Sequence, residues 1–265
     1  MKVGFFQFSP LFGKKDENLK RVSSVIKNTD LELLVLPEFF ATGYQFTSVD
    51  ELEELSEPTQ GGFTTEFLLD LSCEKDMYIV AGMPESYKGI FYNSAILTGP
   101  EGLLGTYRKI HLFFEEKLYF TSGDTGFRVW NTKIGFIGIM ICFDWFFPES
   151  MRSLALLGAE VVAHPANLVL PNCPKAMPIR CLENRVFAIT ANRTGVEDRK
   201  RGQALTFIGQ SQIVSPDGEV LVRSSENEES LVSIEVDLKR ARDKSLNPFN
   251  DIVTDRKPEY YSPLF

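Results

Sequence analysis

Histidine is scarce in this chain, and the motifs of several common catalytic and metal sites are absent. The 265 residues include only two histidines and four cysteines, and no two cysteines form a Cys-x-x-Cys pair. A zinc site needs closely grouped thiolates or several histidines, so we expect no metal. The Gly-x-Ser-x-Gly setting of a serine nucleophile does not occur, and so few histidines disfavour Ser-His and Cys-His mechanisms.

The chain also lacks an excess of positive charge and any long apolar run. Its formal net charge is −8 at pH 7, which argues against a nucleic-acid partner, because phosphate binding needs clustered lysine and arginine. The one basic cluster, Arg199-Lys200-Arg201, lies beside Glu197-Asp198 and is expected to be a solvated loop. No apolar stretch approaches a membrane span and the N-terminus has no signal-peptide layout, so we expect a cytoplasmic protein without a membrane partner.

No linker or low-complexity stretch interrupts the sequence, which predicts a single domain over residues 1–265. Strand and helix patterns alternate early, and several strands follow one another later, which favours an α/β fold with helices covering two sheets or one mixed sheet. The helical patterns span Asp16–Asn28, Thr64–Glu74, Pro148–Leu157 and Lys175–Phe187. The strand patterns span Lys2–Ser9, Leu31–Leu36, Met77–Pro84, Phe91–Thr98, Leu103–Arg108, Phe127–Trp130, Ile134–Cys142, Val161–Pro165, Ala188–Asn192, Gln210–Ser215, Val220–Arg223 and Ser230–Val236.

Cys142 stands where a short apolar run meets the start of a helix. The run Ile134–Ile141 is too short to span a bilayer and reads as a buried strand, and Pro148 suits the first turn of the next helix. A strand-to-helix corner can expose a nucleophile beside backbone N–H groups that favour negative charge. From its position alone, a buried structural cysteine is an equal alternative.

Two upstream segments also place an ionisable residue just after an apolar strand. Glu38 follows Leu33-Leu34-Val35-Leu36-Pro37, and Lys109 follows Gly105-Thr106-Tyr107-Arg108. Active sites collect at strand ends in sheets that are covered by helices. Glu38, Lys109 and Cys142 therefore make a candidate set of base, cation and nucleophile.

These segments resemble the nitrilase superfamily of carbon–nitrogen hydrolases, whose catalytic triad is Glu-Lys-Cys. Matching segments extend from Val3-Gly4-Phe5-Phe6-Gln7 to Asp255-Arg256-Lys257-Pro258-Glu259, almost the whole chain. The resemblance is strongest to the archaeal-type branch, which also reads His164-Pro165-Ala166-Asn167-Leu168. It implies an α/β fold in the form of a four-layer αββα sandwich, which periodicity alone does not show.

The resemblance also implies roles for the triad. Glu38 is expected to act as general base, Cys142 to form a thioester or thioimidate, and Lys109 with the backbone N–H of Phe143 to stabilise the developing charge. The family has a second glutamate near the substrate, and the match favours Glu116, with Glu115 expected to be solvated. No cofactor is required.

Other polar residues near these segments have less specific expectations. Tyr44, His164 and Asn167 are candidates for lining the substrate pocket. His111 is expected to be a hydrogen-bonded structural residue. Asp144 is expected to cap the following helix or to pair with an arginine.

The implied activity is hydrolysis of a small aliphatic nitrile or amide to a carboxylic acid and ammonia. Phe143-Asp144-Trp145 differs from the Asn-Asp-Arg-Arg-like sequence of carbamoyl-amino-acid hydrolases, and an aromatic pocket suits an uncharged substrate. The alternatives are an N-carbamoyl amine amidohydrolase, acyl transfer to an amine, and a non-enzymatic binding relative. A non-enzymatic relative would be expected to lack one triad residue, and this chain has all three.

The C-terminal segment 245–265 is rich in aromatic residues and proline and has no regular period. Such a tail is ordered only when it packs against something, and exposed aromatic residues often mark a contact surface. In the family the corresponding tail reaches across a two-fold dimer. We therefore expect a homodimer, or a higher even-numbered oligomer, with this tail at the interface.

Overall fold

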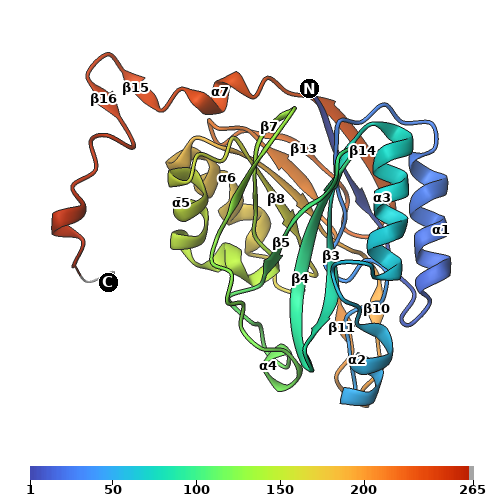
Figure 1. The fold of residues 1–265 in the computed structure, drawn as a ribbon. Coiled ribbons are helices and arrows are strands. Elements are labelled where there is room, and N and C mark those ends of the chain that lie inside the picture. The colour runs from blue at the N-terminus through green and yellow to red at the C-terminus, as the bar shows by residue number, and fades with distance from the viewer. Residues whose placement is uncertain (263–265) are drawn as a thin grey trace.

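The computed structural model describes residues 1–262 and shows two β-sheets packed face to face between helices (Figure 1). Helices α1 (Lys15–Ile26) and α3 (Phe63–Lys75) cover the first sheet. Helices α5 (Pro148–Leu156) and α6 (Cys173–Asn184) cover the second. The expected α/β class and its αββα layering are confirmed.

The first sheet is mixed, in the spatial order β14-β1-β2-β3-β4-β5. Strands β1, β2 and β3 are parallel neighbours, and β3, β4 and β5 form an antiparallel meander, so β5 runs in the same direction as β2. The strands are β1 (Lys2–Gln7), β2 (Leu33–Val35), β3 (Tyr78–Tyr87), β4 (Ile90–Gly99), β5 (Gly102–Arg108) and β14 (Ser230–Glu235).

The second sheet has the order β13-β12-β9-β8-β7-β6, and its central strands β7, β8 and β9 are parallel. Because neighbouring parallel strands end at the same edge of a sheet, the residues that follow β7 and β8 lie together. The strands are β6 (Val129–Thr132), β7 (Gly135–Ile139), β8 (Val161–Pro165), β9 (Phe187–Ala191), β12 (Gln212–Val214) and β13 (Val220–Arg223).

The alternation of side chains along the strands divides the core into layers. In β1, Val3 and Phe5 belong to the cluster between the two sheets. Phe6 and the following Phe8 instead pack in the cluster under α1 and α3. Each fully buried side chain of this size contributes about 1.5–3 kcal/mol of hydrophobic stabilisation. Both faces of the first sheet are therefore apolar, as its near-continuous hydrophobic strands predict.

Every expected strand and helix is present, with ends displaced by a few residues. Shorter elements were not predicted, because one or two helical turns or a strand of two residues carry too little periodicity. They are α2 (Val49–Leu55), α4 (Glu116–Tyr119), α7 (Lys239–Arg242), β10 (Val196–Glu197), β11 (Leu205–Thr206) and the 3₁₀ turns η1 (Cys142–Phe146) and η2 (Pro258–Tyr260). Within residues 1–262, no helix combines the length and apolar composition that crossing a bilayer requires.

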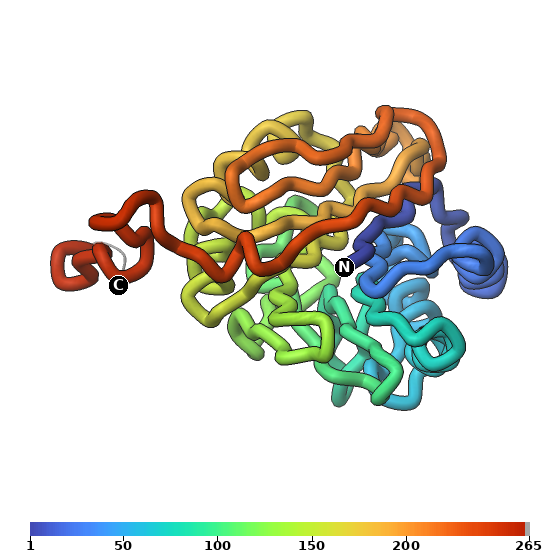
Figure 2. Tube along the Cα trace, turned by 90° about the horizontal axis from the view of Figure 1, so that it is seen from above, coloured from blue at the N-terminus to red at the C-terminus, as the bar shows by residue number. Residues whose placement is uncertain are grey.

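The C-terminal segment leaves the body of the molecule, as Figure 2 shows from above. Within it, β15 (Ser245–Asn247) and β16 (Asn250–Asp251) form a short antiparallel hairpin, which the sequence did not indicate because this segment has no regular period. The hairpin carries Leu246 and Phe249 as exposed side chains. Of the tail expected at 245–265, residues 263–265 lie outside the described residues.

Candidate active site

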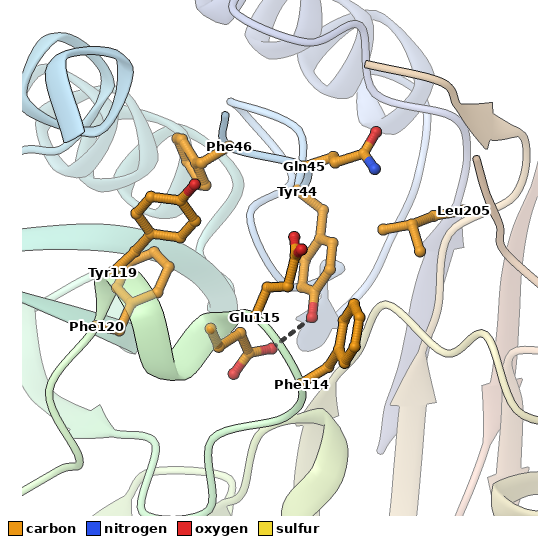
Figure 3. Close-up of a pocket in the computed structure, with 9 residues that line it drawn as sticks. Tyr44, Gln45, Phe46, Phe114, Glu115, Tyr119, Phe120 and Leu205 are labelled. Carbon is orange, nitrogen blue, oxygen red and sulfur yellow. Dashed lines mark hydrogen bonds between the residues drawn. The ribbon is translucent and has the colours of Figure 1, made fainter. Parts of the chain in front are cut away.

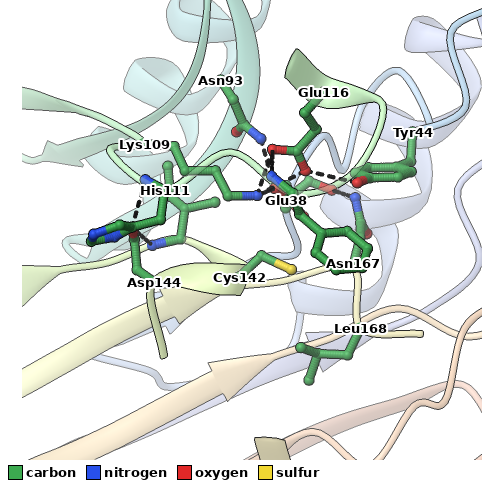
Figure 4. A network of polar contacts seen from close by, with 12 residues as sticks. Glu38, Tyr44, Asn93, Lys109, His111, Glu116, Cys142, Asp144, Asn167 and Leu168 are labelled. Carbon is green, nitrogen blue, oxygen red and sulfur yellow. Dashed lines mark hydrogen bonds and ion pairs between the residues drawn. The ribbon is translucent and has the colours of Figure 1, made fainter. Parts of the chain in front are cut away.

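Four strand ends bring the candidate residues together at one end of the sandwich (Figure 4). Glu38 follows β2 and Lys109 follows β5, two strands of the first sheet that run in the same direction. Cys142 and Asn167 follow the parallel strands β7 and β8 of the second sheet. The site therefore lies where the carboxyl ends of strands from both sheets meet.

The Lys109 ammonium joins two carboxylates in the buried part of the site. Its Nζ lies 2.8 Å from Glu38 Oε1 and 2.8 Å from each carboxylate oxygen of Glu116. Lys109 and Glu38 are both fully buried. Two negative charges and one positive charge are thus held in direct contact away from solvent.

One oxygen of Glu38 is left free by this arrangement. Oε1 accepts hydrogen bonds from Lys109 and from the Asn93 side chain, whose Nδ2 is 2.7 Å away. Oε2 is buried and has no hydrogen-bond partner among residues 1–262. The main-chain carbonyl of Glu38 accepts a hydrogen bond of 2.8 Å from the Asn167 side chain. The carboxylate therefore keeps one oxygen available for a proton.

A glycine in β3 allows the Glu38 turn to lie close to the sheet. A Cβ on Gly82 would lie 2.5 Å from Glu38 Cα, too close for any side chain there. The N–H of Gly82 also donates to the Pro37 carbonyl at 3.3 Å. Gly82 is therefore needed for the close approach of the two backbones.

Burial and charge set the protonation of the central groups. Burial raises the pKa of Glu38, and the Lys109 ammonium opposes that rise only in part. Burial alone would lower the pKa of Lys109, but the carboxylates of Glu116 and Glu38 outweigh it and raise that pKa. Burial and then Glu38 raise the pKa of Cys142 well above its ordinary value. The resting site thus holds a charged lysine and a neutral thiol.

Cys142 occupies a strained corner that several hydrogen bonds hold in place. Its φ of 40° is in the left-handed region, which non-glycine residues rarely adopt. Asp144 accepts a hydrogen bond from the Ile141 N–H at 2.9 Å, as the expected cap does. Of the two expected roles the cap is therefore the one observed, and the ion partner of Asp144 is His111, whose Nδ1 lies 2.7 Å away, in place of an arginine. His111 is therefore hydrogen-bonded, as expected.

His164 is fully buried and contacts the main chain of Cys142. Its Nε2 is 2.9 Å from the Cys142 carbonyl, and its Nδ1 is 3.0 Å from Thr190 Oγ1. Because a carbonyl can only accept, Nε2 carries the proton and Nδ1 accepts from the Thr190 hydroxyl. Both ring nitrogens are thus engaged with the protein. Burial lowers the pKa of His164 to about 4.

Glu116 begins α4 and contacts Tyr44. The Tyr44 hydroxyl donates to Glu116 Oε1 at 2.7 Å, and the Phe113 N–H donates to Oε2 at 3.1 Å. Burial and then the Glu116 carboxylate raise the pKa of Tyr44 well above its ordinary value. Glu115, expected to be solvated, is instead half-buried and forms an ion pair with Lys200.

Two small pockets adjoin these residues. We call the first the Cys142 pocket; it is lined by Phe113, Cys142, Phe143, Trp145, Asn167, Leu168, Val169 and Leu170. We call the second the Tyr44 pocket (Figure 3); it is lined by Tyr44, Gln45, Phe46, Phe114, Glu115, Glu116, Tyr119, Phe120 and Leu205. Cys142 is the only ionisable group among the lining residues of the Cys142 pocket.

Sequence reasoning did not single out Asn93 or Tyr107. Asn93 fixes Glu38, and the Tyr107 hydroxyl donates to Asp144 at 2.8 Å beneath the Cys142 corner. A signal for Asn93 was present, since a buried amide inside the strand pattern Phe91–Thr98 needs a polar partner. The phenol of Tyr107 gave none, because tyrosine is common in strands.

Comparisons with known proteins cover almost the whole chain. Residues 2–244 match the sequence pattern of the family described as carbon-nitrogen hydrolase. The chain is 48% identical to a nitrilase of Pyrococcus abyssi over 98% of this chain and 99% of that protein. It is 36% identical to an (R)-stereoselective amidase of a Pseudomonas species, over 91% and 88% of the two chains. The crystal structure of a carbon-nitrogen hydrolase from Helicobacter pylori superposes with a TM-score of 0.87 at 26% identity, covering 100% and 98%.

We predict that His164 makes the folded chain sensitive to acid. The pKa of His164 is about 4 in the folded chain and about 6.5 when exposed, so between these values only the unfolded chain binds the proton. As pH falls from 7 to 4, the wild type should lose about 3 kcal/mol of unfolding free energy through this group. The His164→Gln variant lacks this loss. The difference in unfolding free energy between wild type and variant, measured by urea denaturation, should therefore shrink by about 3 kcal/mol from pH 7 to pH 4. A gap that is independent of pH would contradict the assignment.

Proposed function

Because the chain belongs to the carbon-nitrogen hydrolase family, we propose that it converts small aliphatic nitriles or amides to carboxylic acids and ammonia through Cys142. The observation that carries this proposal is the buried contact of Lys109 with Glu38 and Glu116 beside a neutral thiol. That arrangement supplies a base, a cation and a nucleophile at one point. No cofactor enters the proposed reaction.

Glu38 is proposed to activate the nucleophile. A neutral thiol is a poor nucleophile, so a base must take its proton. The free Oε2 of Glu38 is available for that proton, and Figure 4 shows the sulfur of Cys142 beside this cluster. The raised pKa of Glu38 makes its carboxylate a stronger base than an exposed glutamate.

The attack forms a bond between sulfur and the substrate carbon. For an amide, negative charge develops on the carbonyl oxygen, and Lys109 with the Phe143 N–H stabilises it; one such donor is worth about 3 kcal/mol. The C–N bond then breaks, and Glu38 returns its proton to the leaving ammonia. Water next attacks the thioester with Glu38 again as base, which releases the acid and the thiol. A nitrile forms a thioimidate first and consumes two waters in total.

Pocket chemistry supports the proposed substrate class. The Cys142 pocket is lined by aromatic and aliphatic side chains with one amide, which suits a short uncharged acyl group. Lys109, the cation beside this pocket, is already paired with two carboxylates. A carboxylate on the substrate would therefore gain little attraction from Lys109.

A second candidate is hydrolysis of an N-carbamoyl amine. Glu115 lines the Tyr44 pocket, where its carboxylate could receive a cationic amine. Its ion pair with Lys200 neutralises that charge, so we place this activity second. Acyl transfer to an amine shares the same thioester and differs only in the acceptor.

Ammonia release from matched substrates tests the proposed function. Propionitrile and propionamide share one acyl group, whereas N-carbamoylputrescine and N-carbamoyl-β-alanine carry a cation and an anion. We expect the first two to have the highest kcat/KM, and added hydroxylamine reports acyl transfer as hydroxamate. Failure to release ammonia from any of them, or a preference for the carbamoyl compounds, would overturn the substrate assignment.

The triad variants should lose nearly all turnover while staying folded. Cys142→Ala, Glu38→Gln and Lys109→Ala each remove one member of a group that acts as a unit, so each loss should be at least about 10³-fold and the triple variant no worse than Cys142→Ala. Cys73→Ala, which removes an exposed thiol, is the control and should keep full activity. Substantial activity in Cys142→Ala would refute the mechanism.

The covalent intermediate should be visible on one cysteine. Mass spectrometry of protein quenched during turnover should find the acyl adduct on Cys142. Burial raises the pKa of Cys173 and Cys181, and Cys142 is the cysteine that lines the pocket next to the cluster, unlike these two and Cys73. An acyl group on one of those three, with Cys142 unmodified, would move the nucleophile elsewhere.

We also propose that the chain is a single cytoplasmic domain that forms a homodimer, with 245–265 at the interface. Leu156 and Leu157 at the end of α5, and Ile179 and Leu182 on α6, are exposed apolar side chains on adjoining helices. Exposed apolar patches of this kind mark contact surfaces. The four cysteines are free thiols, which fits a reducing compartment.

Truncation tests the dimer. Deleting residues 247–265 removes Phe249 and Tyr260, both strongly exposed, and should weaken association. Activity should fall with dissociation, because α5 is connected directly to the Cys142 turn. Sedimentation of the full chain should give a dimer, and a fully active monomer at micromolar concentration would exclude it.

A further inference from the structure

A buried ion pair lies next to the site but has no role in the mechanism above. Arg193, just after β9, is 1% exposed, and Glu197 in β10 is 5% exposed. Their side chains are in direct contact, and the Arg193 guanidinium also lies 4.1 Å from the centre of the Phe207 ring. A buried ion pair contributes little net stability, so its retention calls for another explanation.

Glu197 makes a second set of contacts, with the backbone that carries Tyr44. Its Oε2 accepts hydrogen bonds from the N–H of Tyr44 at 3.1 Å and of Gln45 at 2.6 Å. A Cβ on Gly43, whose φ is +82°, would lie 2.9 Å from Glu197 Oε1, so the carboxylate packs directly against this turn. One buried carboxylate thus fixes the orientation of two consecutive peptide groups.

The Tyr44 side chain continues this chain of contacts to the reacting groups (Figure 4). Its hydroxyl donates to Glu116 Oε1 at 2.7 Å, and both oxygens of Glu116 accept from Lys109 Nζ. Among residues 1–262, the other acceptor of the Lys109 ammonium is Glu38 Oε1. The orientation of the Glu116 carboxylate therefore sets the orientation of Lys109.

We propose that Glu197 is a positioning residue, which holds the Tyr44 backbone so that the Tyr44 hydroxyl fixes Glu116 and, through it, Lys109. Arg193 pairs with Glu197 and holds its carboxylate in place. The inference rests on the proposed function, since it assumes that Lys109 acts on the substrate. A displacement of about 1 Å in such a group can cost about 100-fold in rate.

Other contacts keep the Tyr44 turn in place when Glu197 is altered. The Gln45 side chain donates to the Gln203 carbonyl at 2.7 Å and accepts from the Arg199 N–H at 2.7 Å. Arg199 also pairs with Glu51 in α2. Glu197→Gln should therefore fold with the turn attached but with the Tyr44 peptide less firmly oriented.

A double-mutant cycle tests the proposal. Glu197→Gln and Tyr44→Phe should each lower kcat on propionamide by about 10- to 100-fold with little change in KM. If Glu197 acts through the Tyr44 hydroxyl, the double variant should be about as active as Tyr44→Phe alone. Losses that multiply, or a Glu197→Gln enzyme with the kcat of the wild type, would overturn it.

Glu160→Gln is the matched control. Glu160 is also buried, accepts a backbone N–H from Phe136 at 3.2 Å, and pairs with Arg242. It precedes β8, whereas the site lies beyond the other end of that strand. This variant should lower stability, leave kcat unchanged, and show no coupling to Tyr44→Phe.

A second readout separates this inference from the proposed function. Iodoacetamide alkylation of Cys142, followed by peptide mass spectrometry that distinguishes it from the exposed Cys73, needs no turnover. Glu197→Gln should slow alkylation of Cys142, and Tyr44→Phe should add no further slowing. A wild type that hydrolyses none of the test substrates refutes the proposed function, while the alkylation rates still decide the coupling. If Glu197→Gln does not fold, Glu197→Asp keeps the charge opposite Arg193 and shortens its reach to the Tyr44 N–H.

Discussion

The arrangement of the site depends on the sharing of one buried ammonium by two carboxylates. Lys109 contacts both Glu38 and Glu116 and offsets the cost of burying two carboxylates, because an unpaired buried charge costs several kcal/mol. Stability alone would favour apolar residues at these three positions. The cluster therefore departs from the general rule of an apolar core, as functional sites often do.

The sandwich makes this cluster rigid by building it from both sheets. The base and the cation come from the first sheet and the nucleophile from the second, so the packed layer between the sheets sets the distance between them. Asn93 then holds the side chain of Glu38, and Asn167 holds its main-chain carbonyl. Sites placed on regular elements and supported by such contacts keep their geometry better than sites on free loops.

The sequence predicted the parts of the candidate site that directly follow apolar strands and missed those that depend on distant loops. Glu38, Lys109 and Cys142 were visible because strand ends are readable from hydrophobic runs. The link between Tyr44 and Glu197 was not, since 153 residues separate them and each lies in irregular or very short structure. The sequence predicted a solvated Lys200 because the partner of this side chain, Glu115, is 85 residues away.

The orientation of a buried side chain could also not be predicted from the sequence. His164 was a candidate for lining the pocket and lies in the expected strand Val161–Pro165, but only the packing of β8 against β9 shows that its ring faces Thr190 and the Cys142 carbonyl. The four layers were implied by resemblance to a family, whereas the periodicity of the strands left one mixed sheet open.

The neutral resting state of Cys142 has a consequence for survival under oxidising conditions. Peroxide attacks the thiolate form of cysteine and converts it by steps to acids that are no longer nucleophilic. Burial and the neighbouring Glu38 carboxylate keep the thiol protonated, so the unoccupied site presents little of the form that peroxide attacks. The same surroundings that make Cys142 dependent on a base therefore lower the share of thiolate that peroxide can attack between turnovers.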